Sequence, residues 1–462
     1  MEDHTLLTYL ALDDLSLPGG REEIEVQSLD DFIDSTRTDL QQFLDNLEHA
    51  LSKEVPGYPP LPEKLRFYSE PRAPEGPNES GASKTADTAE TPELLKNWVT
   101  QEESERLFCA LRVNPGYRPG YYIKLRPKME HTQWPEGKAE LAFEDITPYH
   151  HNYPYSRFYP VEPGEKVKPV EVLAAGADEP DYGLDLGLFE DNGTDYGSLY
   201  GFGPQPFGDP TQLRYSQAPL HMGFFHAPWT VYAAHPGYKS SLVQTRVLQF
   251  AALGAFAFSR GYPYWGYRFT GWGLHYVQDL TMPYHVCLAP GLSHTALARI
   301  GLLKAAGITG PFNRLLQRTV RKHILLEMLQ LERVNTLSAT GRNYHSLIQG
   351  IKGTNCQEQD FSPAGLIDIV AKNAHSRARK IGQALDNVIK DQEIFENIHD
   401  FYEQKDYDIY RLCHGPGTQE FDTFQNSLTE ILTETGRHSR GYIRWSTRST
   451  RSGFLKDSLT GL

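Results

Sequence analysis

The residues best suited to chemistry lie in the middle of the chain, where His275 and Asp279 are four positions apart and His285 follows them. Their helical spacing predicts an α-helix, on which His275 and Asp279 project from one face. Pro283 ends that helix and bends the chain, which can return His285 to the helix end. Two imidazoles and a carboxylate that converge in this way suit Zn²⁺. The helix prediction rests on apolar residues at Trp265, Phe269, Trp272 and Tyr276.

An isolated pair of this kind is also common as a buried core histidine and an ordinary helix carboxylate. A second pair has the same spacing, however. His323 and Glu327 lie in a predicted long helix over 310–334, again on one face. The alternative for this second pair is an ordinary surface pair.

Ligands of the same types occur before the central motif. An acidic turn ends in Asp181, directly after Pro180, which fixes the backbone before the carboxylate. Asp178 is the alternative ligand in that turn. Two histidines follow, His221 and His226. His221 is favoured as a ligand, and His226 is the alternative, or a residue that contacts the ligands or the substrate.

The central motif, His-Tyr-x-x-Asp-x-x-x-Pro-x-His over 275–285, closely resembles the signature of the bacterial zinc-dependent phospholipases C. Their relatives include the zinc-dependent single-strand nucleases and the catalytic domain of glycosylphosphatidylinositol-specific phospholipase D. Three shorter stretches resemble the same superfamily: Gly-Ala-x-x-Pro-Asp over 176–181, Pro-Leu-His over 219–221 and Gly-Tyr-Ile over 441–443.

The resemblance implies two or three zinc ions and a set of ligands. One zinc would be held by Asp181, His221, His275 and Asp279, and a second by His285, His323 and Glu327. Asp279 would also bridge to a third zinc, held by His4 and the chain terminus. In the resembled family an N-terminal Trp completes that third site, and no Trp precedes His4. The resemblance assigns catalytic roles to the carboxylates of Asp181, Asp279 and Glu327.

The implied activity is hydrolysis of a phosphodiester, since clustered zinc ions activate water and stabilise charge on the attacking and leaving oxygens. We expect a phospholipase C that acts on phospholipid, with a peripheral membrane contact compatible with that role. A zinc-dependent nuclease or nucleotidase is the first alternative. A non-catalytic, zinc-stabilised binding protein is the second. No serine-hydrolase elbow, phosphate-binding Walker loop or His-Glu-x-x-His protease helix is present to compete.

Composition limits the partners. The net charge of −14 argues against a surface that coats nucleic acid, so no stable nucleic-acid partner is expected. The four cysteines are far apart and predict neither a thiolate zinc site nor a dense disulfide framework. The most apolar run, 247–258, is too short to span a bilayer. No signal peptide precedes His4, which predicts a cytoplasmic protein, or an exported one if the natural N-terminus is longer.

The fold class expected from these patterns is all-α, in a single catalytic domain over 1–462 that resembles the zinc-dependent phospholipases C. The region 52–170, rich in Pro, Gly and Tyr, is expected to be a long irregular insertion with one short strand signal near 121–125. Basic residues of the last helix are expected to form a solvated face, with anionic lipid as the alternative. Helices are predicted over 3–12, 28–51, 93–112, 240–258, 263–281, 310–334, 360–385, 388–404 and 422–446.

Overall fold

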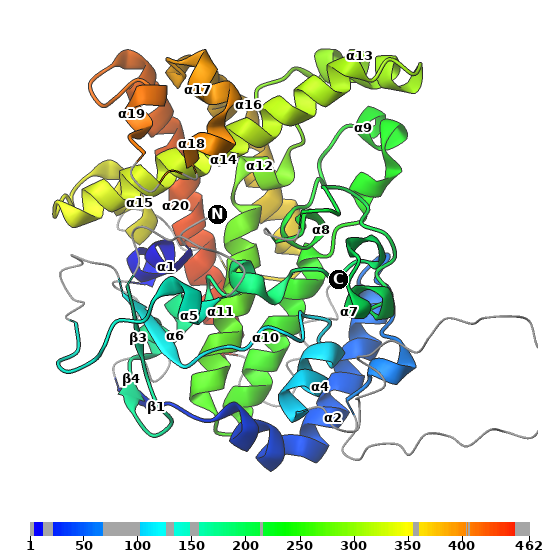
Figure 1. Ribbon diagram of the computed structural model, residues 1–462, viewed down its shortest axis with the longest axis vertical. Coiled ribbons are helices and arrows are strands. Elements are labelled where there is room, and N and C mark those ends of the chain that lie inside the picture. The colour runs from blue at the N-terminus through cyan, green and yellow to red at the C-terminus, as the bar shows by residue number, and fades with distance from the viewer. Residues whose placement is uncertain are drawn as a thin grey trace, which may run out of the picture.

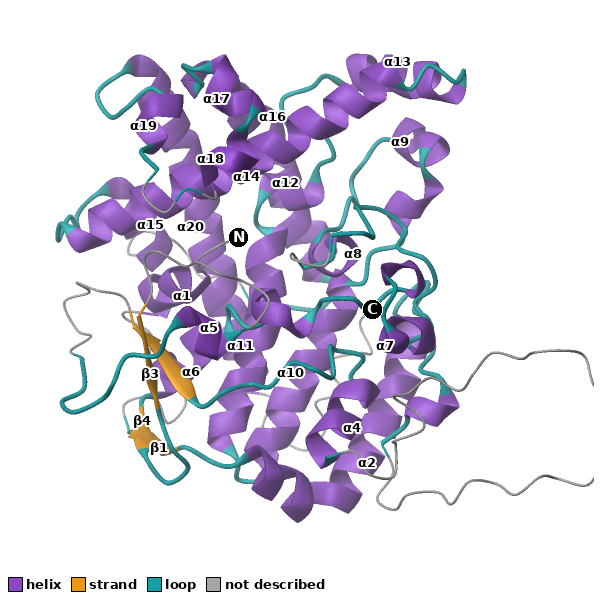
Figure 2. Ribbon diagram, in the orientation of Figure 1, coloured by secondary structure: helices purple, strands orange, loops and turns teal. Residues whose placement is uncertain are grey.

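Helices account for 64% of the structure and strands for 4%, so the predicted all-α class is confirmed. Figure 2 shows the strands confined to one small region beside the helical body. The computed structural model describes residues 4–12, 22–67, 102–125, 134–147, 157–212, 216–353, 360–402, 404 and 407–448.

Two apolar helices in the centre of the molecule organise the fold (Figure 1). α10 runs over Val243–Ser259 and α11 over Pro263–Leu280, joined by a short turn. Both are apolar nearly all round, so nearly every residue in them is buried. The stretch Pro236–Ser259 is long and apolar enough to cross a membrane, but 83% of its apolar window is buried inside the protein. α10 therefore has the character of a core helix.

The short helix α6, Pro169–Gly176, crosses α11 at very close range. A Cβ atom on Gly176 would lie 2.7 Å from the backbone oxygen of Arg268, and one on Gly271 would lie 2.5 Å from that of Leu173. These two positions therefore have to be glycine, because any side chain would push the helices apart. The contact fixes the turn after α6, which carries Asp181, against the middle of α11.

Two long helices and the N-terminal helix complete the layer around α11. α20, Gln419–Arg448, and α16, Lys372–Val388, pack against each other, and α20 also packs on α11. α1, His4–Leu12, is wholly buried between α6, α15 and α20. The start of the described chain is thus an interior element.

The upper part of the molecule in Figure 1 is built around α14, Gly310–Ala339, a helix of 30 residues. Its second half is buried with α15, Ser346–Lys352, and with the short helices α17, α18 and α19. Its first half lies beside α13, His294–Ala305, which packs on α9, Trp229–Ala234. Of the short helices, α17 runs over Gln392–Glu396, α18 over Ile398–Tyr402 and α19 over Ile409–Leu412.

The lower part contains α2, Leu29–Glu54, whose N-cap Ser28 accepts a hydrogen bond from the backbone of Asp31. Beside it lies α4, Glu103–Ala110. Two antiparallel pairs of strands follow: β2, Tyr122–Leu125, pairs with β3, Arg157–Pro160, and β1, Ile24–Glu25, pairs with β4, Lys166–Val167. The described parts of 52–170 are built into the main core, through residues such as Leu107, Phe108, Val113, Ile123 and Phe158.

Several one- or two-turn elements connect these helices. Those near the candidate site are the π-helical turn η2, Pro180–Leu184, and the helices α8, Ala218–His221, and α12, Pro283–Val286. The others are η1 Glu63–Leu65, α5 Phe143–Ile146, η3 Glu190–Asn192, α7 Asp195–Leu199, η4 Pro236–Lys239 and η5 Leu366–Ala371.

Most of the predicted helices are present, with shifted ends. The stretch predicted over 360–385 begins as a π-helical segment at Leu366, and that predicted over 388–404 is two short helices. Within the helix predicted over 93–112, the structure has α4 from Glu103, after its N-cap Glu102, to Ala110, and residues 93–101 lie outside the described chain. The predicted solvated face of the last helix is wrong at Arg440, which is buried and donates to the backbone oxygen of Ile351 at 2.6 Å.

Candidate metal centre

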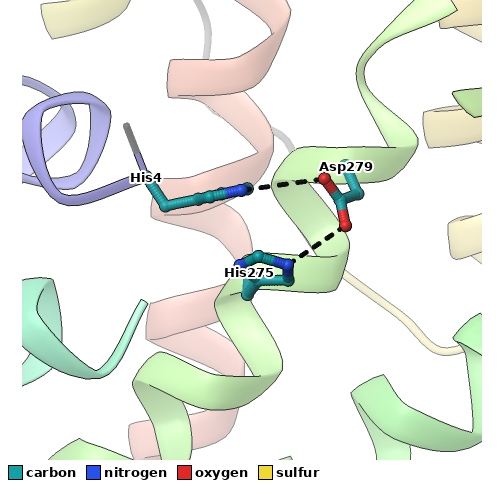
Figure 3. A group of neighbouring side chains, drawn as sticks. All are labelled: His4, His275 and Asp279. Carbon is teal, nitrogen blue, oxygen red and sulfur yellow. Dashed lines mark ion pairs between the residues drawn. The ribbon is translucent and has the colours of Figure 1, made fainter. Parts of the chain in front are cut away.

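Side chains from six elements meet beside the C-terminal end of α11. Their metal-ligating atoms form three groups, and within each group these atoms lie within 4.8 Å of one another. Figure 3 shows the first group, in which the ring of His4 on α1 points toward two side chains of α11. The groups are His4, His275 and Asp279; Asp181, His221 and His275; and His285, His323 and Glu327. Every predicted ligand belongs to one of them.

The chain geometry around Pro283 brings the last histidine of the central motif into place. α11 ends at Leu280, and the backbone N–H of Met282 still donates to the oxygen of Asp279 at 2.9 Å. Pro283 then opens α12, where its missing N–H costs nothing. The predicted helix, proline bend and return of His285 are thus all present: His285 Nδ1 lies 3.4 Å from Asp279 Oδ1.

Asp279 lies at the junction of the groups, and its two oxygens face different neighbours. Oδ2 lies 2.9 Å from His221 Nδ1 and 3.3 Å from His275 Nε2. Oδ1 lies 3.7 Å from His4 Nε2 and 3.4 Å from His285 Nδ1. The residue is fully buried on α11. One carboxylate can therefore serve two neighbouring metal positions.

Asp181 divides its oxygens in a similar way. Oδ1 lies 3.6 Å from His275 Nε2 and 3.9 Å from His221 Nδ1, whereas Oδ2 lies 3.9 Å from His4 Nε2. Its side chain is 31% exposed, so it stands at the edge of the centre. Asp181 and Asp279 together flank the space between His4 and the pair His221 and His275.

The third group is the more open one. His285 Nε2 lies 3.0 Å from His323 Nε2 and 3.7 Å from Glu327 Oε1. His323 and Glu327 are one turn apart on α14, with Nε2 and Oε1 at 3.0 Å. Their side chains are 19% and 15% exposed. The ring of Tyr284 stacks on His323 at a centroid distance of 5.8 Å and holds its orientation.

Three of the histidines have one ring nitrogen fixed by an oxygen outside the centre. His275 Nδ1 donates to the backbone oxygen of Ala177 at 2.8 Å, and His4 Nδ1 donates to Gln278 Oε1 at 2.8 Å. His285 Nδ1 donates to the backbone oxygen of His221 at 3.1 Å. In each ring the proton is then on Nδ1, and Nε2 faces the centre with a lone pair. Metal-binding histidines are oriented in this way.

A fourth histidine, His221, is held by Asp185, a residue that the sequence analysis did not identify. Its Nε2 lies 3.1 Å from Asp185 Oδ2, and Asp185 is also bonded by Arg246 Nη2 at 2.9 Å and by the Tyr276 hydroxyl at 2.7 Å. Asp185 is fully buried and turns His221 Nδ1 toward Asp279. The signal that could have indicated it is Arg246, the one charged residue in the apolar helix α10, which needs a buried counter-charge.

Two alternative ligands considered from the sequence lie outside the three groups. Asp178 accepts hydrogen bonds from the backbone of His4 at 2.9 Å, from the Thr5 hydroxyl and from the Lys124 ammonium, so it holds the start of α1 in place. His226 Nε2 lies 2.8 Å from the backbone oxygen of Ile367, and His226 belongs to none of the groups.

Burial and charge set the protonation of the centre. Burial, then the nearby ring of His275, lowers the pKa of His4 to about 3, so its ring is neutral near pH 7. Burial alone would raise the pKa of Asp279, but the rings of His285 and His275 hold it well below its usual range. Burial likewise opposes the ionisation of Asp181, but the neighbouring rings of His275, His221 and His4 contribute to outweighing it, leaving a pKa of about 2. The carboxylates are ionised, as metal ligands must be.

Two buried atoms of the first group have no hydrogen-bond partner among the described residues: His4 Nε2 and Asp279 Oδ1, which are 3.7 Å apart. A buried polar atom without a partner is costly, and a cation between these two would satisfy both. Zn–N bonds of 2.0–2.1 Å in a tetrahedron place ligand atoms roughly 3.3 Å apart. The 3.0 Å between His285 Nε2 and His323 Nε2 and the 3.3 Å between His275 Nε2 and Asp279 Oδ2 fit that spacing. The residues present therefore fit bound metal ions.

Comparisons of the chain with family models, with curated proteins and with solved structures found no match. The chemistry of the centre is therefore derived from its own side chains.

Proposed function

We propose that this protein is a zinc-dependent phosphodiester hydrolase, most simply a phospholipase C that acts on phospholipid. One observation carries the proposal. Three groups of ligand atoms lie side by side; His275 belongs to two of them, and the buried carboxylate of Asp279 lies within 3.7 Å of a histidine of each. Three of the histidines have the ring nitrogen that faces away from the centre bonded to an oxygen. Histidine and carboxylate ligands in this number suit zinc, and groups that share a ligand suit a cluster of ions.

The ligand groups divide into two adjoining positions and one further position. His221, His275, Asp181 Oδ1 and Asp279 Oδ2 would hold one zinc, and His4 with the other oxygens of Asp181 and Asp279 would hold its neighbour. A further zinc would be held by His285, His323 and Glu327. Bound zinc supplies a lowered pKa for water and stabilises negative charge on the phosphoryl and leaving oxygens.

The chain itself positions and protects these groups. His275 and Asp279 are fully buried, whereas Asp181, His323 and Glu327 are partly exposed. A phosphodiester would therefore approach from the side of the exposed three. Asp181 is ionised and stands at this opening, so its carboxylate can accept a hydrogen bond from a water molecule that enters with the substrate. Asp185 keeps the ring of His221 in position throughout, by accepting from Nε2.

Phospholipid is proposed as the substrate class over nucleic acid because of charge. A single-strand nuclease needs a positively charged groove with stacking platforms, whereas this chain has a net charge of −14. The resemblance of the central motif to the zinc-dependent phospholipases C supports the same choice.

The proposal is tested by a parallel assay of the zinc-loaded protein on phosphatidylcholine, single-stranded DNA and RNA. We expect release of phosphorylated head group, abolished by a chelator and restored by added zinc. Release of nucleotides in place of head group would replace the phospholipase with a nuclease. Retention of zinc without turnover of any of the three would contradict the enzymatic proposal and favour a zinc-stabilised binding protein.

A further inference from the structure

Exposed large apolar side chains are concentrated in one layer of the molecule. Among the described residues, six are exposed, and five of these lie on α9, on α13, on the turn after it and on the first half of α14. The sixth is Tyr344, beyond the other end of α14. We name the five the upper apolar face: Trp229, Leu302, Ile308, Leu316 and Val320, with exposed fractions of 77%, 73%, 53%, 42% and 41%.

The same layer differs in charge from the rest of the protein. The net charge of the chain is −14, yet no Asp or Glu occurs in residues 280–326, which carry six Lys and Arg residues. Three of these cations pair with acidic residues of α16 and α17: Arg318, Arg321 and Lys322. The other three, Arg299, Lys304 and Arg314, make no ion pair with any described residue. Lys304 lies over the ring of Phe312 at 3.7 Å.

The face leads directly to the open metal group. Leu316, Val320, His323 and Glu327 follow one another at steps of four, three and four residues, so they share one side of α14. Seven residues of helix, from Leu316 to His323, span about 10 Å. The layer is also anchored to the ligands, because Leu297 of α13 packs in an apolar cluster with Met222, next to His221.

We propose that the upper apolar face docks the protein on the surface of a phospholipid bilayer that contains anionic lipid. This inference rests on the proposed function, because docking would bring the metal centre to phospholipid, the proposed substrate. Apolar side chains with an exposed Trp, beside three cations that make no ion pair with any described residue and on a stretch without Asp or Glu over 280–326, match a bilayer surface in both polarity and charge. Because His323 is only about 10 Å along α14 from Leu316, docking of the face would bring the open metal group close to the lipid head groups.

The experiment measures vesicle binding and turnover separately. Zinc-loaded protein is sedimented with vesicles of phosphatidylcholine alone and of phosphatidylcholine mixed with phosphatidylglycerol. Hydrolysis is measured on a short-chain phosphatidylcholine kept monomeric, which needs no docking. The variants are Leu302→Glu and Leu316→Glu, and the matched control is Tyr344→Glu, the same kind of change at the exposed apolar residue outside the face. Asp279→Asn is sedimented in parallel to show that binding does not need turnover.

We expect the mixed vesicles to bind the protein and added salt to weaken that binding. Leu302→Glu and Leu316→Glu should each bind about tenfold more weakly, and Tyr344→Glu should bind as the parent does. All three should retain hydrolysis of the monomeric lipid. The face is refuted if the parent protein binds neither vesicle, or if the two variants bind as well as the control.

Two mixed outcomes separate the inference from the proposed function. Vesicle binding that depends on Leu302, without hydrolysis of any lipid, would support membrane docking by the face and contradict the proposed phospholipase activity. Hydrolysis of the monomeric lipid without vesicle binding would support the phospholipase activity and contradict membrane docking. The parent protein could instead bind no vesicle and form a dimer that Leu302→Glu dissociates. That result would show that the face packs against a second copy of the chain and would contradict docking on a bilayer.

Discussion

The metal centre and the upper apolar face differ in how many segments of the chain form them and in how far their side chains are held by partners. The centre gathers ligands from elements that begin at His4 and end at Glu327, and nearly every polar atom behind the ligands has a partner. The face comes mostly from one stretch, α13 and the first half of α14. Its large side chains are exposed, and three of the six cations of 280–326 make no ion pair with any described residue. Reaction chemistry needs atoms held in advance, whereas contact with a fluid surface needs only exposure.

The difference predicts how each region responds to substitution. Changes at the centre should be large, should appear in zinc content and should depend on pH. Changes at the face should leave zinc content and stability almost unchanged.

Asp279→Asn should have the largest effect. The substitution keeps the shape of the side chain but removes the charge that serves two metal positions, so zinc content should fall and turnover should drop more than about a hundredfold. Metal analysis and initial rates on phosphatidylcholine measure both. The matched control is Asp195→Asn, the same change at an exposed residue of α7. A variant that retains zinc and more than about a tenth of the rate would show that Asp279 is not a shared ligand.

Asp185→Asn should lower zinc affinity about 10- to 100-fold, because His221 loses the acceptor that fixes its ring. It should also lower the free energy of unfolding by about 3 kcal/mol, because Arg246 stays buried without its counter-charge. Competition with a zinc chelator measures the affinity, and denaturant unfolding the stability.

Glu179→Gln separates these two effects. The substitution removes the charged partner of another buried arginine, Arg268. Glu179 itself belongs to none of the ligand groups. Stability should fall by a similar amount while zinc affinity stays unchanged. If both substitutions lower zinc affinity equally, Asp185 acts through the fold alone and does not position His221.

Zinc affinity should rise with pH. Burial alone would lower the pKa of His221, but hydrogen bonds to Asp185 and Asp279 raise it to about 10. Without metal the ring is therefore protonated near pH 7, and a metal ion must displace that proton. The ring of His4 stays neutral in this range, since its pKa is about 3, so metal binding at its Nε2 displaces no proton. Affinity should increase about tenfold per pH unit between about pH 6 and pH 8. Affinity that is constant over this range would contradict a ligand role for His221.

His226→Ala should have the smallest effect on the centre. Its ring is engaged with the backbone oxygen of Ile367, so the variant should lose about 1 kcal/mol of stability and keep its zinc. Equilibrium unfolding and metal analysis measure the two quantities. Loss of zinc from this variant, with zinc retained by His221→Ala, would exchange the roles of the two histidines.

Local patterns in the sequence predicted the central part of the site, because its geometry is local. Helical spacing places His275 beside Asp279, and Pro283 returns His285 to the helix end. Sequence alone could not place Asp185, whose role depends on Arg246 and Tyr276 from two other helices. It also did not predict that residues of 52–170, such as Lys124, are buried beside α1 and α6, since the ion pair with Asp178 joins distant segments.

The proposed zinc-dependent function depends most directly on where metal ions bind. The measurement that tests it is anomalous diffraction at the zinc absorption edge, on crystals of protein expressed with added zinc. We expect one peak among His221, His275 and Asp279 and another among His285, His323 and Glu327, with the position beside His4 as the site of a third. Crystals that give no zinc peak at any of these positions would contradict it.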